Sequence, residues 1–168
     1  AKIAASGGGE RLITAKSEPV FGCVYKLVAV EDKDGNIVPK IKISENVGKI
    51  TTPHFKKLYR FYGRDTGKAI ADYLTVYDET VDDSQNLEIF DPDATWKRKE
   101  VYHFEARELL VPIYQKGKLV YKRPGIEEIK KYCTEQVDTL WDEVKRFDNP
   151  HNYYVDLSQK LYDIKTEL

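Results

Sequence analysis

The chain has 168 residues, a length that suits one domain or one domain with part of another. Its 41% hydrophobic and 33% charged residues are typical of a water-soluble globular protein, and the net charge of −1 argues against a nucleic-acid partner. No apolar run approaches the roughly 20 residues that a membrane-spanning helix needs, so we expect no membrane segment and no signal peptide.

The chain begins with a predicted short strand at 1–5, a glycine run at Gly7, Gly8 and Gly9, and one or two helical turns at 10–15. Fixing a glycine loses more backbone entropy than fixing any other residue, so a glycine run is expected only where the backbone needs it. A flexible linker would explain the run. A phosphate-binding loop would also explain it, because bare backbone N–H groups at a helix N-terminus bind anions.

Three β-hairpins are predicted after this segment. The first contains Asp34-Gly35, which is typical of a tight turn, and the second turns at 63–68. The acidic stretch 78–93 is expected to be an irregular connection. The predicted strand pairs are 23–31 with 37–44, 57–62 with 69–77, and 108–114 with 118–122.

Two helices are predicted at the C-terminal end. Apolar residues recur at steps of three and four from Ile126 to Phe147, which predicts a helix of about six turns with one wide apolar stripe. A last helix is predicted near Asp156, which has the capping-box spacing to Gln159. Its expected buried face consists of Leu157, Leu161, Ile164 and Leu168. Hairpins followed by helices predict an α+β module, whereas the first strand and glycine loop are typical of the end of an α/β unit.

Few residues of the chain are of the types that most often carry chemistry or stacking. They are His54, His103 and His151, Cys23 and Cys133, and Trp96 and Trp141. The histidines lack metal-ligand spacing and are expected at the surface or at an interface, and the cysteines are expected to be free thiols in a reducing cytoplasm. The tryptophans are expected in the core or at an interface. These patterns predict no catalytic set and no metal site.

Many separate segments, in the same order, resemble the C-terminal third of bacterial nicotinate phosphoribosyltransferases. They include "GGGERLITAKSEPVFGCVYKLVAVED", "PKIKIS", "KITTP", "GKAIAD", "IFDPDATWKRK", "ARELLVPIY", "GKLVY", "TLWDEVKRF" and "VDLSQKLYDIK". The resemblance implies that residues 1–54 are the final piece of a phosphoribosyltransferase α/β barrel. Residues 55–168 would then be a hairpin-rich C-terminal domain with two terminal helices.

The resemblance also implies an activity. These transferases form nicotinate mononucleotide from nicotinate and phosphoribosyl diphosphate, with ATP hydrolysis and Mg²⁺, in NAD biosynthesis. The family implies a cytoplasmic homodimer. Its catalytic histidine would lie upstream of residue 1, in a missing N-terminal portion, so we expect this chain alone to be inactive and to bind no cofactor by itself.

The resemblance assigns roles to two sets of residues. Gly7, Gly8 and Gly9 take the place of the family's phosphate-binding loop, although Ala4, Ser6 and Glu10 depart from the residues usual around it. Lys42, Ser44, Lys49 and Thr51 match a family loop and are expected near the active-site mouth or the dimer interface, with a simple surface loop as the alternative. His54 stands where the family usually has glycine.

Two other functions stay open at this point. The hairpins and the long helix would also suit a non-catalytic protein-interaction module, with the glycines as a tether. A related phosphoribosyltransferase acting on nicotinamide or quinolinate is the second, because the pocket that selects the base is expected upstream of this chain.

Overall fold

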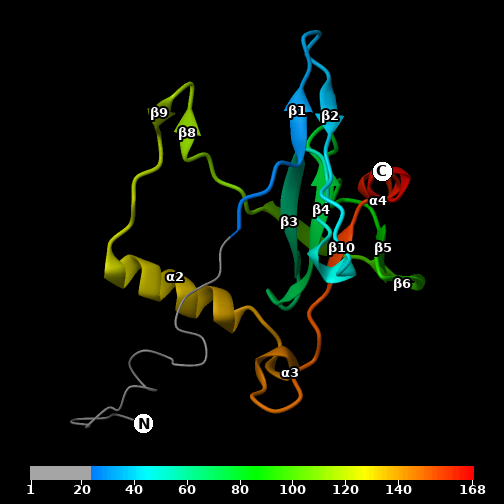
Figure 1. The fold of residues 1–168 in the computed structure, drawn as a ribbon. Coiled ribbons are helices and arrows are strands. Elements are labelled where there is room, and N and C mark those ends of the chain that lie inside the picture. Colours follow the sequence, from blue (N-terminus) through cyan, green and yellow to red (C-terminus); the bar gives the residue numbers. More distant parts are fainter. Residues whose placement is uncertain (1–23) are drawn as a thin grey trace, which may run out of the picture.

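The computed structural model describes residues 24–168, and a four-stranded sheet forms its centre (Figure 1). The strand order is β10 (Val155–Leu157), β4 (Ala69–Val76), β3 (Lys56–Gly63) and β7 (Phe104–Glu108). Strand β3 pairs antiparallel with β4 and β7, whereas β10 runs parallel to β4. The predicted strand 1–5, the glycine run and the helical turns at 10–15 lie outside the described residues.

Three two-stranded hairpins and three α-helices surround this sheet (Figure 1). The hairpins are β1 (Ala29–Glu31) with β2 (Ile37–Pro39), β5 (Leu87–Asp91) with β6 (Ala94–Val101), and β8 (Tyr114–Gln115) with β9 (Lys118–Leu119). The helices are α2 (Ile126–Asp138), α3 (Asp142–Lys145) and α4 (Gln159–Glu167), and Val47–Lys49 forms a single 3₁₀ turn. This is a mixed α+β arrangement. No helix of residues 24–168 combines the length and apolar character that a bilayer crossing requires.

The main core lies between the sheet and the β5–β6 hairpin. Successive side chains of a strand point to opposite faces, so alternate residues of β3 and β4 face this layer. Phe61 is fully buried against Phe104 of β7, with ring centroids 4.7 Å apart. The other members of the cluster are Tyr59, Ala71, Tyr73, Ile89 and Val101. The hairpin at 87–101 therefore supplies the second layer of the fold.

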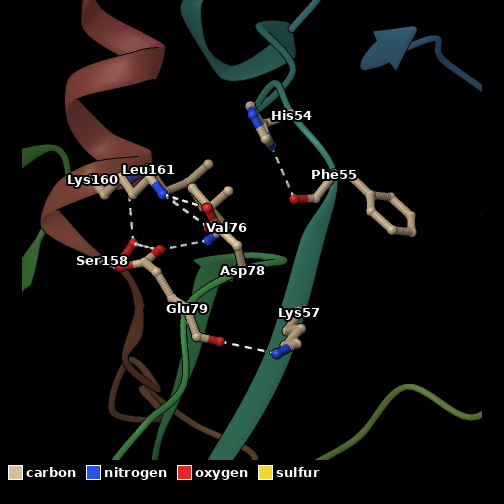
Figure 2. Close-up of polar contacts among 9 residues, drawn as sticks. All are labelled: His54, Phe55, Lys57, Val76, Asp78, Glu79, Ser158, Lys160 and Leu161. Carbon is tan, nitrogen blue, oxygen red and sulfur yellow. Dashed lines mark hydrogen bonds and ion pairs between the residues drawn. The ribbon is translucent and has the colours of Figure 1, made fainter. Parts of the chain in front are cut away.

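Hydrogen bonds join the start of helix α4 to the C-terminal end of β4 (Figure 2). The Ser158 hydroxyl accepts the Leu161 N–H at 3.2 Å as the helix N-cap and donates to Glu79 Oε2 at 2.7 Å. Glu79 Oε2 also accepts the Val76 N–H at 2.7 Å. Leu161 packs with Val76 and Leu157 in a second small core. One carboxylate thus joins the end of β4 to the start of the last helix.

The hairpin predictions were partly correct. The second hairpin is confirmed, at 56–63 with 69–76, and the turns of the first and third hairpins are also found. The strands of the first and third hairpins are much shorter than predicted. The prediction of an irregular connection at 78–93 was wrong over its second half, because Leu87–Asp91 forms β5. Its buried Ile89 and Phe90 contribute apolar surface that the surrounding acidic residues obscure in the sequence.

The prediction of one six-turn helix was also wrong. Helix α2 ends at Asp138, and a separate short helix follows at 142–145. Lys68 Nζ donates to the carbonyls of Asp138 and Leu140 at 2.7 and 3.3 Å, and the Ala69 N–H donates to the Thr139 carbonyl at 2.9 Å. These tertiary hydrogen bonds occupy carbonyls that a continuing helix would use. The described chain therefore ends in three helices where two were predicted.

The last helix begins three residues later than predicted. Asp156 lies in β10 rather than at the helix start, because that segment pairs with β4, and Ser158 is the N-cap. Of the expected buried face, Leu157 and Leu161 are buried, Ile164 is partly buried and Leu168 is 51% exposed.

Candidate functional site

The predicted phosphate-binding residues Gly7, Gly8 and Gly9 lie outside the described residues. The other predicted site residues, Lys42, Ser44, Lys49 and Thr51, follow one another along the loop between β2 and β3. Within that loop, their side chains form no hydrogen bond or ion pair with one another. The structure therefore places these four residues on one segment without joining them into a single cluster.

Local hydrogen bonds shape the first part of this loop. The Ser44 hydroxyl accepts the Asn46 N–H at 3.3 Å, and Asn46 Oδ1 accepts the Gly48 N–H at 3.0 Å. Lys26 Nζ donates to the Lys49 carbonyl at 2.9 Å, which ties the loop to the segment before β1. The Thr51 hydroxyl is buried and has no hydrogen-bond partner in the part of the chain that the structure describes. A buried hydroxyl without a hydrogen-bond partner is unfavourable unless another group forms a hydrogen bond with it.

Lys56 and His54 fix the end of the loop to the sheet. Lys56 Nζ donates to three backbone carbonyls, those of Thr52, Pro53 and His54, at 2.9, 3.1 and 2.7 Å. Burial lowers the pKa of the Lys56 ammonium, while these carbonyls satisfy its N–H donors. The His54 N–H donates to the Val28 carbonyl at 2.8 Å, joining the loop to the start of β1. The loop therefore enters β3 from a firmly held turn.

His54 has a backbone φ of +76°, in the left-handed region that favours glycine. Its ring is buried, and Nδ1 lies 3.1 Å from the Phe55 carbonyl (Figure 2). The resemblance places glycine at this position in most relatives, and the observed φ gives the physical reason. The expectation of a surface histidine was wrong for His54, whereas His103 and His151 are exposed.

A groove of about 1230 Å³ lies between the β5–β6 hairpin and the segment from α3 to β10. Its lining mixes acids, bases and aromatic rings, including Asp91, Lys97, Lys99, Trp141, Tyr154 and Asp156. Asp91 and Lys97 form a loose ion pair at 3.9 Å, and Lys99 Nζ lies 5.3 Å from the centre of the Tyr154 ring. Trp141 is 43% exposed and Trp96 is 78% exposed, so neither is a core residue.

Asp156 is the most unusual residue of this groove. It is only 3% exposed, and no hydrogen bond to its carboxyl is found among the described residues. Its pKa is raised to about 6, chiefly by burial and also by the nearby Asp91, while Lys99 opposes the shift. The sequence did not predict a buried carboxyl here, because the spacing of Asp156 to Gln159 suggested a helix cap.

A second carboxylate, the partly buried Asp72, has hydrogen-bond partners at both oxygens. Arg60 donates to both of its oxygens at 2.7 and 2.9 Å across the β3–β4 pair, and the Tyr153 hydroxyl donates to Oδ1 at 3.0 Å. Burial and the neighbouring Asp72 raise the pKa of Tyr153 above its usual value. No group of three His, Cys, Asp or Glu side chains within residues 24–168 could hold a metal ion. The described residues thus form stabilising networks and a groove.

Known proteins place the chain in a family. The sequence model described as "Nicotinate phosphoribosyltransferase C-terminal domain" matches residues 55–165. The chain belongs to this family. It is 42% identical to nicotinate phosphoribosyltransferase of Bacillus subtilis over 167 residues, which cover 99% of this chain and 34% of the relative. It is 36% identical to the Caenorhabditis elegans protein of the same name, covering 96% of this chain and 28% of the relative.

A solved structure agrees with the fold. The crystal structure of human nicotinic acid phosphoribosyltransferase matches with a TM-score of 0.62 and 24% sequence identity, covering 70% of this chain and 23% of that chain. At this identity the match supports the fold alone. The chain spans about a third of the length of the curated relatives that it matches. The family resemblance drawn from the sequence motifs is confirmed.

Proposed function

We propose that this chain is the C-terminal part of a nicotinate phosphoribosyltransferase, which forms nicotinate mononucleotide from nicotinate and phosphoribosyl diphosphate with ATP hydrolysis. The product would serve NAD biosynthesis in the cytoplasm. The observation that carries the proposal is the 42% identity to the Bacillus subtilis enzyme across 99% of the chain. Alone, the chain is expected to be inactive, and the complete enzyme is expected to be a homodimer.

Within this function, residues 1–54 contribute the last piece of the α/β barrel and one wall of the active site. Gly7, Gly8 and Gly9 bind the 5-phosphate of the ribosyl substrate, because glycines let backbone N–H groups approach a phosphate without obstruction. Lys42, Ser44, Lys49 and Thr51 lie at the mouth of that site.

Mg²⁺ and ATP belong to the complete enzyme in this proposal. The described residues do not fit a metal site, because 24–168 contain no group of three suitable side chains. The described residues also hold the mouth loop, residues 40–55, in place, because Lys56 Nζ donates to the carbonyls of Thr52, Pro53 and His54 at its end.

The test uses a full-length chimera in which this chain replaces the aligned part of the Bacillus subtilis enzyme. We expect the chimera to convert nicotinate and phosphoribosyl diphosphate to nicotinate mononucleotide. Base preference is not a readout of this test, because the Bacillus subtilis part would supply the base-selecting pocket. A chimera that unfolds cooperatively yet forms no nicotinate mononucleotide would contradict the proposal. That result would favour a non-catalytic interaction module.

Two glycine-to-alanine variants of the same chimera test whether the glycine run binds phosphate. Gly8→Ala should raise the KM for phosphoribosyl diphosphate by about tenfold or more, because a methyl group would obstruct the phosphate. Gly125→Ala is the matched control, since a Cβ at Gly125 meets no atom within 4 Å among the described residues. If Gly8→Ala and Gly125→Ala have the same KM, the phosphate role of the glycine run is wrong.

A further inference from the structure

Helix α2 carries an apolar stripe that no described residue covers. At 100° per residue, Ile126, Ile129, Cys133 and Val137 fall on one side of the helix. Its opposite side is charged, with Glu127, Glu128, Lys131, Glu135 and Asp138. None of its 13 residues is buried. The sequence pattern correctly predicted the stripe, but the described chain does not bury it.

Only the C-terminal end of α2 is attached to the sheet. Besides the hydrogen bonds from Lys68 and Ala69, the Tyr62 hydroxyl donates to Gln136 Oε1 at 3.3 Å. Among residues 24–168, the earlier turns of α2 make no hydrogen bond to another strand or helix. An isolated helix of this length is marginal in water, so packing of the stripe must supply its stability.

The β8–β9 arm, residues 109–123, carries further exposed apolar residues. Figure 1 shows the arm and α2 on one side of the sheet, with α4 and the β5–β6 hairpin on the other. Leu109 of the arm is partly buried, but the other large apolar residues of the arm and of the α2 stripe are between 39% and 77% exposed. In the arm these are Leu110, Val111, Ile113, Tyr114, Leu119, Val120 and Tyr121. A monomeric soluble protein rarely exposes this many large apolar side chains on one side of its fold.

We propose that the α2 stripe and the β8–β9 arm form the surface on which the remaining part of a nicotinate phosphoribosyltransferase packs. The curated relatives carry about two-thirds of their length outside the matched segment, so they contain the chain needed to cover it. The charged side of α2 faces away from this contact and stays in solvent. The inference rests on the proposed function, because it identifies the partner as the rest of that enzyme.

Cys133 provides a native probe, because its thiol is exposed and lies within the stripe. Its alkylation rate is measured by peptide mass spectrometry, which separates it from Cys23, in the 168-residue chain and in the chimera defined above. We expect rapid alkylation in the chain and a rate at least about tenfold lower in the chimera, since a covered thiol reacts only after local opening. The same measurement on the Bacillus subtilis enzyme, with a single cysteine at the aligned position, applies even if the chimera misfolds.

A matched pair of variants tests the geometry of the contact. Ile129→Glu places a charge in the stripe and should restore rapid alkylation of Cys133 in the chimera. Lys131→Glu introduces the same residue on the charged side and should leave the thiol protected. Equal protection in both variants would overturn the proposal.

Other results separate the possible occupants. Slow alkylation of Cys133 in the dilute 168-residue chain would show that this chain covers its own stripe, and protection that grows with chain concentration would show a second copy. Either result overturns the proposal, as does rapid alkylation in a chimera that forms nicotinate mononucleotide. A protected thiol in a folded but inactive chimera would support the surface while contradicting the proposed function.

Discussion

Replacing Asp156 by asparagine should stabilise the chain, and the gain should grow with pH. The carboxyl is 3% exposed, and its pKa is raised from 3.8 to about 6. A raised pKa means that the folded state binds the proton more tightly than the unfolded state does. Asp156 therefore does not destabilise the folded state at low pH, where its carboxyl is protonated in both states. The destabilisation grows as the pH rises from about 4 to about 6 and stays constant above that range.

The shift of roughly two units gives the size of the effect. At about 1.4 kcal/mol for each unit, ionised Asp156 destabilises the fold by about 3 kcal/mol at pH 8 and by about half of that at pH 5. Asparagine has nearly the same shape and no charge, so Asp156→Asn should be more stable than the parent by up to these amounts. Asp91→Asn should lower the pKa of Asp156, because Asp91 is one of the groups that raise it.

Urea unfolding at pH 5 and pH 8, followed by circular dichroism, measures the gain, and an NMR titration of the Asp156 carboxyl measures its pKa directly. Asp148→Asn is the control, because Asp148 is exposed and should give the same stability as the parent at both pH values. A titration midpoint near 4, or a stability gain that does not change between pH 5 and pH 8, would refute the reasoning.

Two further substitutions test the loop and the last helix. At His54, which has a φ of +76°, glycine should change the free energy of unfolding by no more than about 1 kcal/mol, whereas β-branched valine should destabilise by about 2 kcal/mol or more in the same urea assay. Equal stability of His54→Gly and His54→Val would contradict the assigned strain. Ser158→Ala removes the helix N-cap and one partner of Glu79, so we expect a loss of about 1–3 kcal/mol in thermal unfolding. The exposed Thr134→Ala control on α2 should change stability by less than about 0.5 kcal/mol, and an equal loss in both variants would show that the Ser158 hydrogen bonds are not stabilising.

The sequence predicted best where local pattern and tertiary environment agree. The β3–β4 hairpin was predicted because the runs "KLYRFY" and "AIADYLTVY" flank a turn that contains Gly63 and Gly67, the latter at a φ of +64°. Strand β5 was missed because Asp82 and its neighbours make the region look like a solvated loop. Asp82 in fact closes a local turn by accepting the Ser84 N–H at 3.0 Å, and the strand begins a few residues later.

The remaining errors arose where distant residues decide local structure. The periodic pattern from 126 to 147 does not predict the end of α2 at Asp138. The helix ends there because Lys68 and Ala69, in the β3–β4 hairpin, donate hydrogen bonds to carbonyls that a continuing helix would use. The strand at Asp156 is fixed in the same way by pairing with β4. The roles of Lys42, Ser44, Lys49 and Thr51 stay a prediction, which the resemblance to the family carries. The sequence did not indicate that the Thr51 hydroxyl is buried without a hydrogen-bond partner among the described residues, because burial depends on the fold.

The two ends of β3 separate the proposed substrate loop from the proposed docking surface. The mouth loop enters β3 at Lys56, whereas α2 is attached near the other end, at Tyr62 and just beyond it at Lys68. An eight-residue strand spans about 25 Å, which is too far for a side chain on α2 to touch a substrate at the loop. A charge in the α2 stripe should therefore weaken assembly of the enzyme, while the fraction that assembles keeps the parent KM for nicotinate. Variants of the mouth loop should behave in the opposite way, because they alter the site without exposing the stripe.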